Sequence, residues 1–172
     1  MTLNEYQVLA ARTIATDNKA DMECHALYGL TAEIGELMDS CFDTDVDHTI
    51  KELGDVCWML AELCTAHGWY LSDLLFPEHW GFKIGMFANC TCIVIANGQI
   101  DGTYQKVLQG HEWDEATVKR AINEIFARIA TLAEFCGTDL ESVLQTNIRK
   151  LEARYPDGFD ADRSQHRADG DV

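Results

Sequence analysis

Two closely spaced pairs of carboxylates are the residues best suited to chemistry in this sequence. Glu33 and Glu36 are separated by two residues, and so are Glu52 and Asp55. At that spacing both acids of a pair lie on neighbouring turns of one helix face. If the pairs meet, they repel one another, because burying unpaired charge costs several kcal/mol. A hard divalent cation between them removes that cost, and all-oxygen ligation favours magnesium, manganese or calcium over zinc.

Two amphipathic helices are expected to carry these pairs. Apolar residues recur at helical spacing over residues 22–42 and again over 47–67, and an Asp- and Thr-rich turn at 43–47 separates the two segments. Aspartates of this turn can cap the second helix, and Gly68 can end it. The sequence therefore predicts an antiparallel helix hairpin.

The position of the acids along these helices brings both pairs to one level. Glu36 lies eight residues before Thr44 and Asp55 eight residues after Asp47, which is about 12 Å at 1.5 Å per residue. A single Glu-x-x-Glu is more often solvated helix surface. Here each pair lies in apolar sequence and encloses a glycine, Gly35 or Gly54. These glycines predict close helix packing and favour a built site.

A group of polar residues near the end of the chain is the candidate for binding substrate phosphate. Lys150 and Arg154 are four residues apart on a predicted helix over 139–154, and Asn147 lies one turn earlier. Residues at this spacing share a face, and positive charges there suit phosphate oxygens. The alternative is that the two cations only complement the helix dipole, an effect of about 0.3–1 kcal/mol.

The rest of the chain also favours helices. Only two prolines occur, Pro77 and Pro156, and the long segments between them repeat apolar residues at helical rather than alternating spacing. This pattern predicts an all-α protein. The further segments are a first helix over 3–16, a connector over 69–83, a helix over 84–108, a helix over 112–135 and a polar tail over 159–172.

Composition excludes several classes of function. The 172 residues carry 13 Lys+Arg against 29 Asp+Glu, a formal charge of −16. Such a surface repels a phosphate backbone, so nucleic-acid polymers are not expected as partners. There is no apolar run long enough for a membrane span and no secretory signal at the start, which predicts a cytoplasmic protein. The seven cysteines are odd in number and lie mainly in apolar runs, which is typical of reduced thiols.

The acid pairs and two further segments resemble a known family. Residues 33–36 and 52–58, Glu-Ile-Gly-Glu and Glu-Leu-Gly-Asp-Val-Cys-Trp, are similar to the signature of the MazG-like all-α nucleotide pyrophosphohydrolases. The opening Asn-Glu-Tyr-Gln at 4–7 fits this pattern, as does the closing segment 147–159. The resemblance covers most of the chain outside residues 76–111.

The resemblance implies a function, a cofactor and an assembly. A nucleoside triphosphate would be hydrolysed to the monophosphate and pyrophosphate, with water attacking a metal-bound α-phosphorus. Magnesium, or manganese in its place, would be held by three or four of the acids, one of which could instead orient the water. The implied assembly is a homodimer or homotetramer of a domain over 1–158. The alternative is a non-catalytic all-α module that binds metal or mediates interactions. A ferritin-like di-iron site would need Glu-x-x-His pairs, which we do not find.

The second half of the chain resembles a degenerate repeat of the first half. Segments 60–64 and 71–75 recur as 132–136 and 140–144. In this register Ala127 takes the place of Asp55 and Glu124 that of Glu52, so the unit over 84–156 would lack metal ligands, whereas the unit over 1–75 would keep them.

The segment 84–108 can be interpreted in two ways. Its β-branched residues and Asn97-Gly98 also fit a β-hairpin. A helix is favoured because the repeat makes this segment the counterpart of the helix over 22–42. Tyr6 and Trp58 are interpreted as core residues rather than base-stacking groups.

Overall fold

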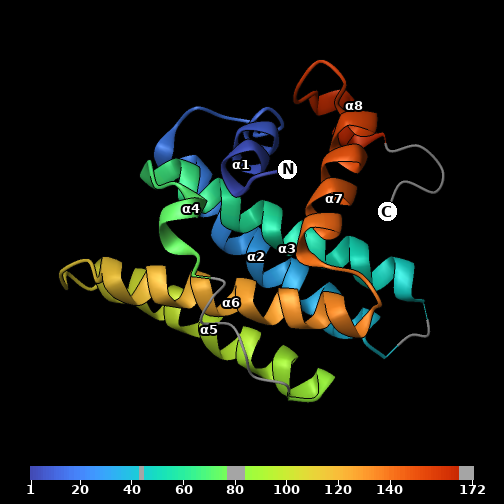
Figure 1. Ribbon diagram of the computed structural model, residues 1–172. Coiled ribbons are helices and arrows are strands. Elements are labelled where there is room, and N and C mark those ends of the chain that lie inside the picture. The colour runs from blue at the N-terminus through green and yellow to red at the C-terminus, as the bar shows by residue number, and fades with distance from the viewer. Residues whose placement is uncertain (43–44, 77–83, 167–172) are drawn as a thin grey trace.

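The computed structural model describes residues 1–42, 45–76 and 84–166, and over these it is all-helical, without a strand (Figure 1). The predicted fold class is confirmed. No helix in these ranges combines the length and the apolar character needed to span a bilayer. The helices are α1 (Leu3–Ala11), α2 (Lys19–Ser40), α3 (Val46–His67), α4 (Leu71–Leu74), α5 (Met86–Leu108), α6 (Glu115–Phe135), α7 (Leu140–Arg154) and α8 (Ala161–Gln165).

Helices α2 and α3 pack side by side as the predicted hairpin. The side chain of Asn18 accepts from the first turn of α2, which is why this helix begins three residues earlier than expected. Asp45 caps α3 by accepting from the backbone N–H of His48 at 3.1 Å. Gly68 ends α3 in the left-handed conformation, with φ 68°. Residues 43 and 44 of the connecting turn lie outside the described residues.

Helices α5 and α6 form a second hairpin that lies below the first in Figure 1. The preference for a helix over 84–108 is confirmed. Asn97 does not turn the chain, because it is buried within α5 and its side-chain amide donates to Thr31 of α2 and Asp101. Ile93, one of the β-branched residues of this segment, is fully buried in the core. Tertiary packing therefore outweighs the strand preference of these residues. Duplication remains a prediction from sequence.

Both ends of the chain differ from the sequence prediction. Helix α1 ends at Ala11 rather than near residue 16. Just beyond this end, the hydroxyl of Thr13 donates to the carbonyl of Ala10. The tail was predicted as a polar loop, which is wrong for α8, where Asp160 caps a short helix. The backbone N–H of Phe159 donates to the carbonyl of Arg12, so the tail lies against the end of α1.

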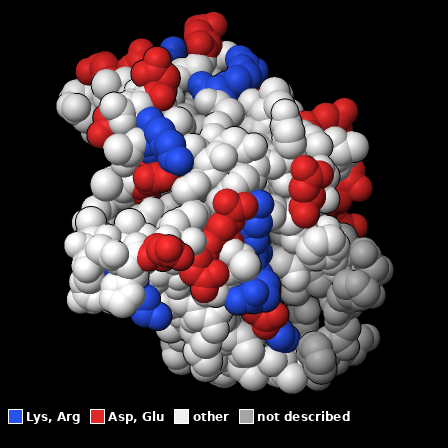
Figure 2. Space-filling model, turned by 90° about the vertical axis from the view of Figure 1, so that its left-hand side faces the viewer, with Lys and Arg blue, Asp and Glu red and all other residues white. Residues whose placement is uncertain are grey.

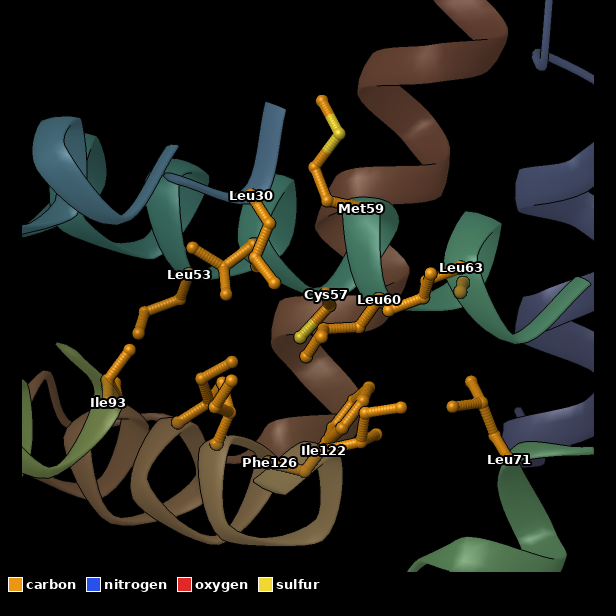
Figure 3. Packing of buried hydrophobic residues seen from close by; sticks show 14 of the residues in the cluster. Leu30, Leu53, Cys57, Met59, Leu60, Leu63, Leu71, Ile93, Ile122 and Phe126 are labelled. Carbon is orange, nitrogen blue, oxygen red and sulfur yellow. The ribbon is translucent and has the colours of Figure 1, made fainter. Parts of the chain in front are cut away.

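One hydrophobic core joins the two hairpins and α7. Helix α3 lies at its centre, and Figure 3 shows Cys57 and Leu60 of α3 directed toward Ile122 and Phe126 of α6. All four side chains are fully buried. Helix α7 packs across α3 and α1 (Figure 1), so it is fixed to the helix that carries the second acid pair.

Candidate metal centre

Three of the four predicted acids meet between α2 and α3. Glu33 and Glu36 project from α2 and Glu52 from α3, and each offers a carboxylate oxygen within 4.8 Å of the others. Glu52 is 2% exposed, Glu33 is half-buried and Glu36 is exposed. The cluster is therefore closed on the α3 side and open on the α2 side, where a ligand can enter.

The electrostatics of this cluster call for a cation. Burial, followed by the charges of Asp55, Glu36 and Glu52, raises the pKa of Glu33 to about 7. Burial and the Asp55 charge also raise the pKa of Glu52. Its Oε1 lies 3.1 Å from Nε2 of His48, whereas its buried Oε2 has no hydrogen-bond partner among the described residues. An unpaired oxygen among three acids fits a hard divalent ion such as magnesium or manganese.

The fourth acid, Asp55, is held by α7. Its Oδ2 lies 2.5 Å from Nζ of Lys150, and its Oδ1 accepts from the side-chain amide of Asn147 at 3.0 Å. Burial raises the pKa of Asp55, while the charge of Lys150 opposes that shift. Asp55 is thus neutralised by a lysine and stays one helical turn from the three-acid cluster.

Asn147 does not line the cavity, contrary to the sequence prediction of a phosphate contact. It is 2% exposed, and its amide oxygen accepts from the hydroxyl of Tyr6 at 3.0 Å. Both ends of the amide are therefore engaged, one with Tyr6 and the other with Asp55. Its role in the structure is to orient Asp55. Tyr6 itself is fully buried, which confirms its assignment to the core.

The two glycines between the acids have different surroundings. A Cβ added at Gly54 would lie 2.8 Å from Cβ of Asn147, so this glycine permits the close approach of α3 and α7. A Cβ at Gly35 would meet nothing within 4 Å, and the predicted close packing at Gly35 is wrong. The close contact of α2 with α3 lies at Gly29 instead, because a Cβ added there would collide with the side chain of Met59 of α3.

A cavity of about 320 Å³ lies over the four acids. Lys150 and Arg154 of α7 contribute to its wall, so the cations predicted to bind phosphate share one space with the predicted metal ligands. Charged side chains are also unevenly distributed over the surface of the molecule. Figure 2 shows a face on which acidic and basic side chains gather in a band across a largely uncharged surface. At the cavity itself, Lys150 and Arg154 supply local positive charge in a chain whose formal charge is −16.

Two further cavity residues were missed or misassigned from sequence. Trp58 was interpreted as core, but it is only half-buried and lines the cavity. His25 also lines it, and its Nδ1 lies 2.7 Å from Oε2 of the buried Glu62. A signal was present, because His25 precedes Glu33 by eight residues and Glu62 follows Asp55 by seven. Both spacings continue the acidic helix faces by about two turns.

The second hairpin has a different arrangement at the matching position. Glu124 of α6 accepts from Nε of Arg128 at 2.7 Å, one turn along the same helix. Its carboxylate is therefore engaged in an ion pair.

No protein-family model, curated protein or solved structure matches this chain. Its function must consequently be argued from the site.

Proposed function

We propose that this chain is a magnesium-dependent nucleoside triphosphate pyrophosphohydrolase of the MazG-like type. One observation carries the proposal. A cluster of three glutamates that fits a divalent cation and two cations that suit phosphate, Lys150 and Arg154, open into the same cavity. Enzymes that cleave phosphoanhydrides need both components, because the reacting phosphates carry several negative charges.

The reaction consumes one water. Its oxygen bonds to the α-phosphorus, the bond from the α-phosphorus to the bridging oxygen breaks, and pyrophosphate leaves with that oxygen. The water's proton passes to a carboxylate oxygen of the cluster that is not engaged with metal. Glu33, Glu36 and Glu52 would hold magnesium, which supplies neutralisation of phosphate charge and a lowered pKa for water. Manganese has the same ligand preference and is expected to substitute.

Lys150 has two partners in this scheme, at different stages. In the structure it pairs with Asp55. A bound divalent cation would supply positive charge near Asp55, and the ammonium group would then be available to a phosphate oxygen. Asn147 keeps Asp55 oriented throughout, since its amide is fixed on the other side by Tyr6. The exchange couples metal binding to substrate binding.

The test is to incubate the purified protein with a panel of ribo- and deoxynucleoside triphosphates and magnesium, and to quantify monophosphate and pyrophosphate. We expect equimolar release of both products and a loss of at least about a hundredfold in kcat for Glu36→Gln. The matched control is Asp39→Asn, one turn further along the same exposed side of α2 and outside the cavity. It should leave turnover unchanged.

Two results would overturn the proposal. One is the absence of turnover for every nucleotide. If magnesium still binds in that case, the chain is a non-catalytic metal-binding module. The other is turnover that Glu36→Gln leaves intact, because this would place the reaction away from the acid cluster.

A further inference from the structure

The end of the cavity beyond the acid cluster contains groups that neither metal nor phosphate binding uses. His25 lies eight residues before Glu33 on α2, about 12 Å along the helix axis. Trp58 lies one turn beyond Asp55 on α3, and Tyr155 and Phe159 also line the cavity. The cavity wall therefore combines aromatic side chains with ionic ones.

The imidazole of His25 is held in one orientation. Glu62 is 1% exposed, and its Oε2 lies 2.7 Å from Nδ1 of His25. A buried carboxylate is costly without a partner, so Nδ1 carries the proton and donates to Glu62. The Nε2 atom is then on the opposite edge of the ring, and half of the His25 side chain is exposed. Glu62 thus presents a fixed imidazole edge to the cavity.

Trp58 is fixed as well. Its ring meets that of His25 edge-to-face, with centroids 5.8 Å apart and planes at 81°. Its Nε1 donates to the hydroxyl of Thr13 at 3.0 Å. An indole whose N–H is satisfied by the protein offers a ligand its π-face rather than a hydrogen bond. The pair consequently combines one stacking surface with one hydrogen-bonding edge at right angles to it.

We propose that His25, positioned by Glu62, recognises the nucleobase of the substrate while Trp58 stacks on it. This inference rests on the proposed function, which places the phosphates at the acid cluster and Lys150. A nucleobase is the aromatic part of a nucleotide, and it presents hydrogen-bonding atoms on its edge at right angles to its stacking face. A ring protonated at Nδ1 alone accepts a hydrogen bond at Nε2, and an imidazolium donates one there. Each nucleobase offers both donors and acceptors on its edge, so His25 should strengthen the binding of every ligand that carries a base.

Binding of the two products separates this proposal from a role in phosphate binding. The affinities of UMP, CMP, GMP, AMP and pyrophosphate are measured by direct calorimetric titration of the full chain with magnesium present. In His25→Ala all four monophosphates should bind at least about tenfold more weakly than they bind the wild type, because the base loses its hydrogen-bonding partner. Pyrophosphate should bind within about twofold of the wild type, because it has no base.

Two companion variants guard against a purely structural effect. His25→Gln retains a side-chain amide that can donate to Glu62, so the fold is kept, but it does not also present an imidazole edge to the base. It should weaken the monophosphates as His25→Ala does. Tyr28→Ala removes an exposed aromatic residue of the same helix outside the cavity and should bind every ligand as the wild type does.

The outcomes are distinct. If His25→Ala weakens pyrophosphate as much as the monophosphates, the histidine binds phosphate and the proposal fails. It also fails if both His25 variants bind the monophosphates as tightly as the wild type does. Either failure can accompany full turnover in the triphosphate assay, in which case the pyrophosphohydrolase function stands and only the base assignment is lost.

Discussion

Replacing Gly54 by alanine tests the close approach of α3 and α7 that holds Asp55 in place. The new Cβ would lie 2.8 Å from Cβ of Asn147, so the two helices must separate or the asparagine must move. Overpacking of this kind costs about 1–3 kcal/mol. Alanine in place of a helical glycine contributes about 1 kcal/mol in the opposite direction. The net change in unfolding free energy is therefore small, and a reference is needed to isolate the packing cost.

Gly35→Ala is that reference. Gly35 occupies the matching place between two acids, is exposed, and has nothing within 4 Å of its added Cβ. It should gain the helix propensity alone, about 0.5–1 kcal/mol. Gly54→Ala is expected to be about 1–3 kcal/mol less stable than Gly35→Ala, since the propensity gain cancels between them.

The assay is urea unfolding followed by circular dichroism, with a chelator present so that metal binding does not contribute. In a thermal scan the same difference corresponds to about 2–4 °C per kcal/mol for a chain of this size. Equal stability of the two variants would refute the tight α3–α7 contact.

Three further predictions concern the charges and the hydrogen bonds of the site. Because the pKa of Glu33 rises from 4.5 to about 7 on folding, the metal-free native state binds more protons than the unfolded chain between these values. Its unfolding free energy should fall as pH rises through this window, and magnesium affinity in titration calorimetry should rise. Lys150→Met should raise KM at least about tenfold without weakening magnesium binding, and the reverse pattern in kinetics and calorimetry would contradict its exchange between Asp55 and phosphate. Tyr6→Phe should lower the unfolding free energy by about 1–3 kcal/mol, because the buried oxygen of Asn147 loses its donor, whereas an unchanged urea midpoint would argue against that hydrogen bond.

The helices and the acid cluster were predictable because both depend on short-range periodicity. The spacing within each pair and from the turn places Glu33, Glu36 and Glu52 on facing sides of two helices, and the structure brings these three together. The same spacing could not reveal that Asp55 is diverted to Lys150. That contact depends on where α7 crosses α3, which sequence periodicity does not encode.

The two glycines illustrate the same limit. Gly35 and Gly54 are equivalent in the sequence, each between two acids on an amphipathic helix. Only the assembled fold shows that α7 packs on one of them, while the α2–α3 contact closes at Gly29. His25 and Glu62 were missed because each is a single residue whose meaning depends on its partner across the hairpin.

Helix α7 adds two cations, Lys150 and Arg154, to the wall of a cavity that the α2–α3 hairpin lines with acids. The α2–α3 hairpin alone would bring like charges together, and the metal-free protein would have to tolerate their repulsion. Lys150 reduces that cost by pairing with Asp55, the acid farthest into α3, and leaves the three glutamates to the cation. In the proposed reaction Lys150 would also meet a substrate phosphate, so substrate binding would have to break or share its contact with Asp55.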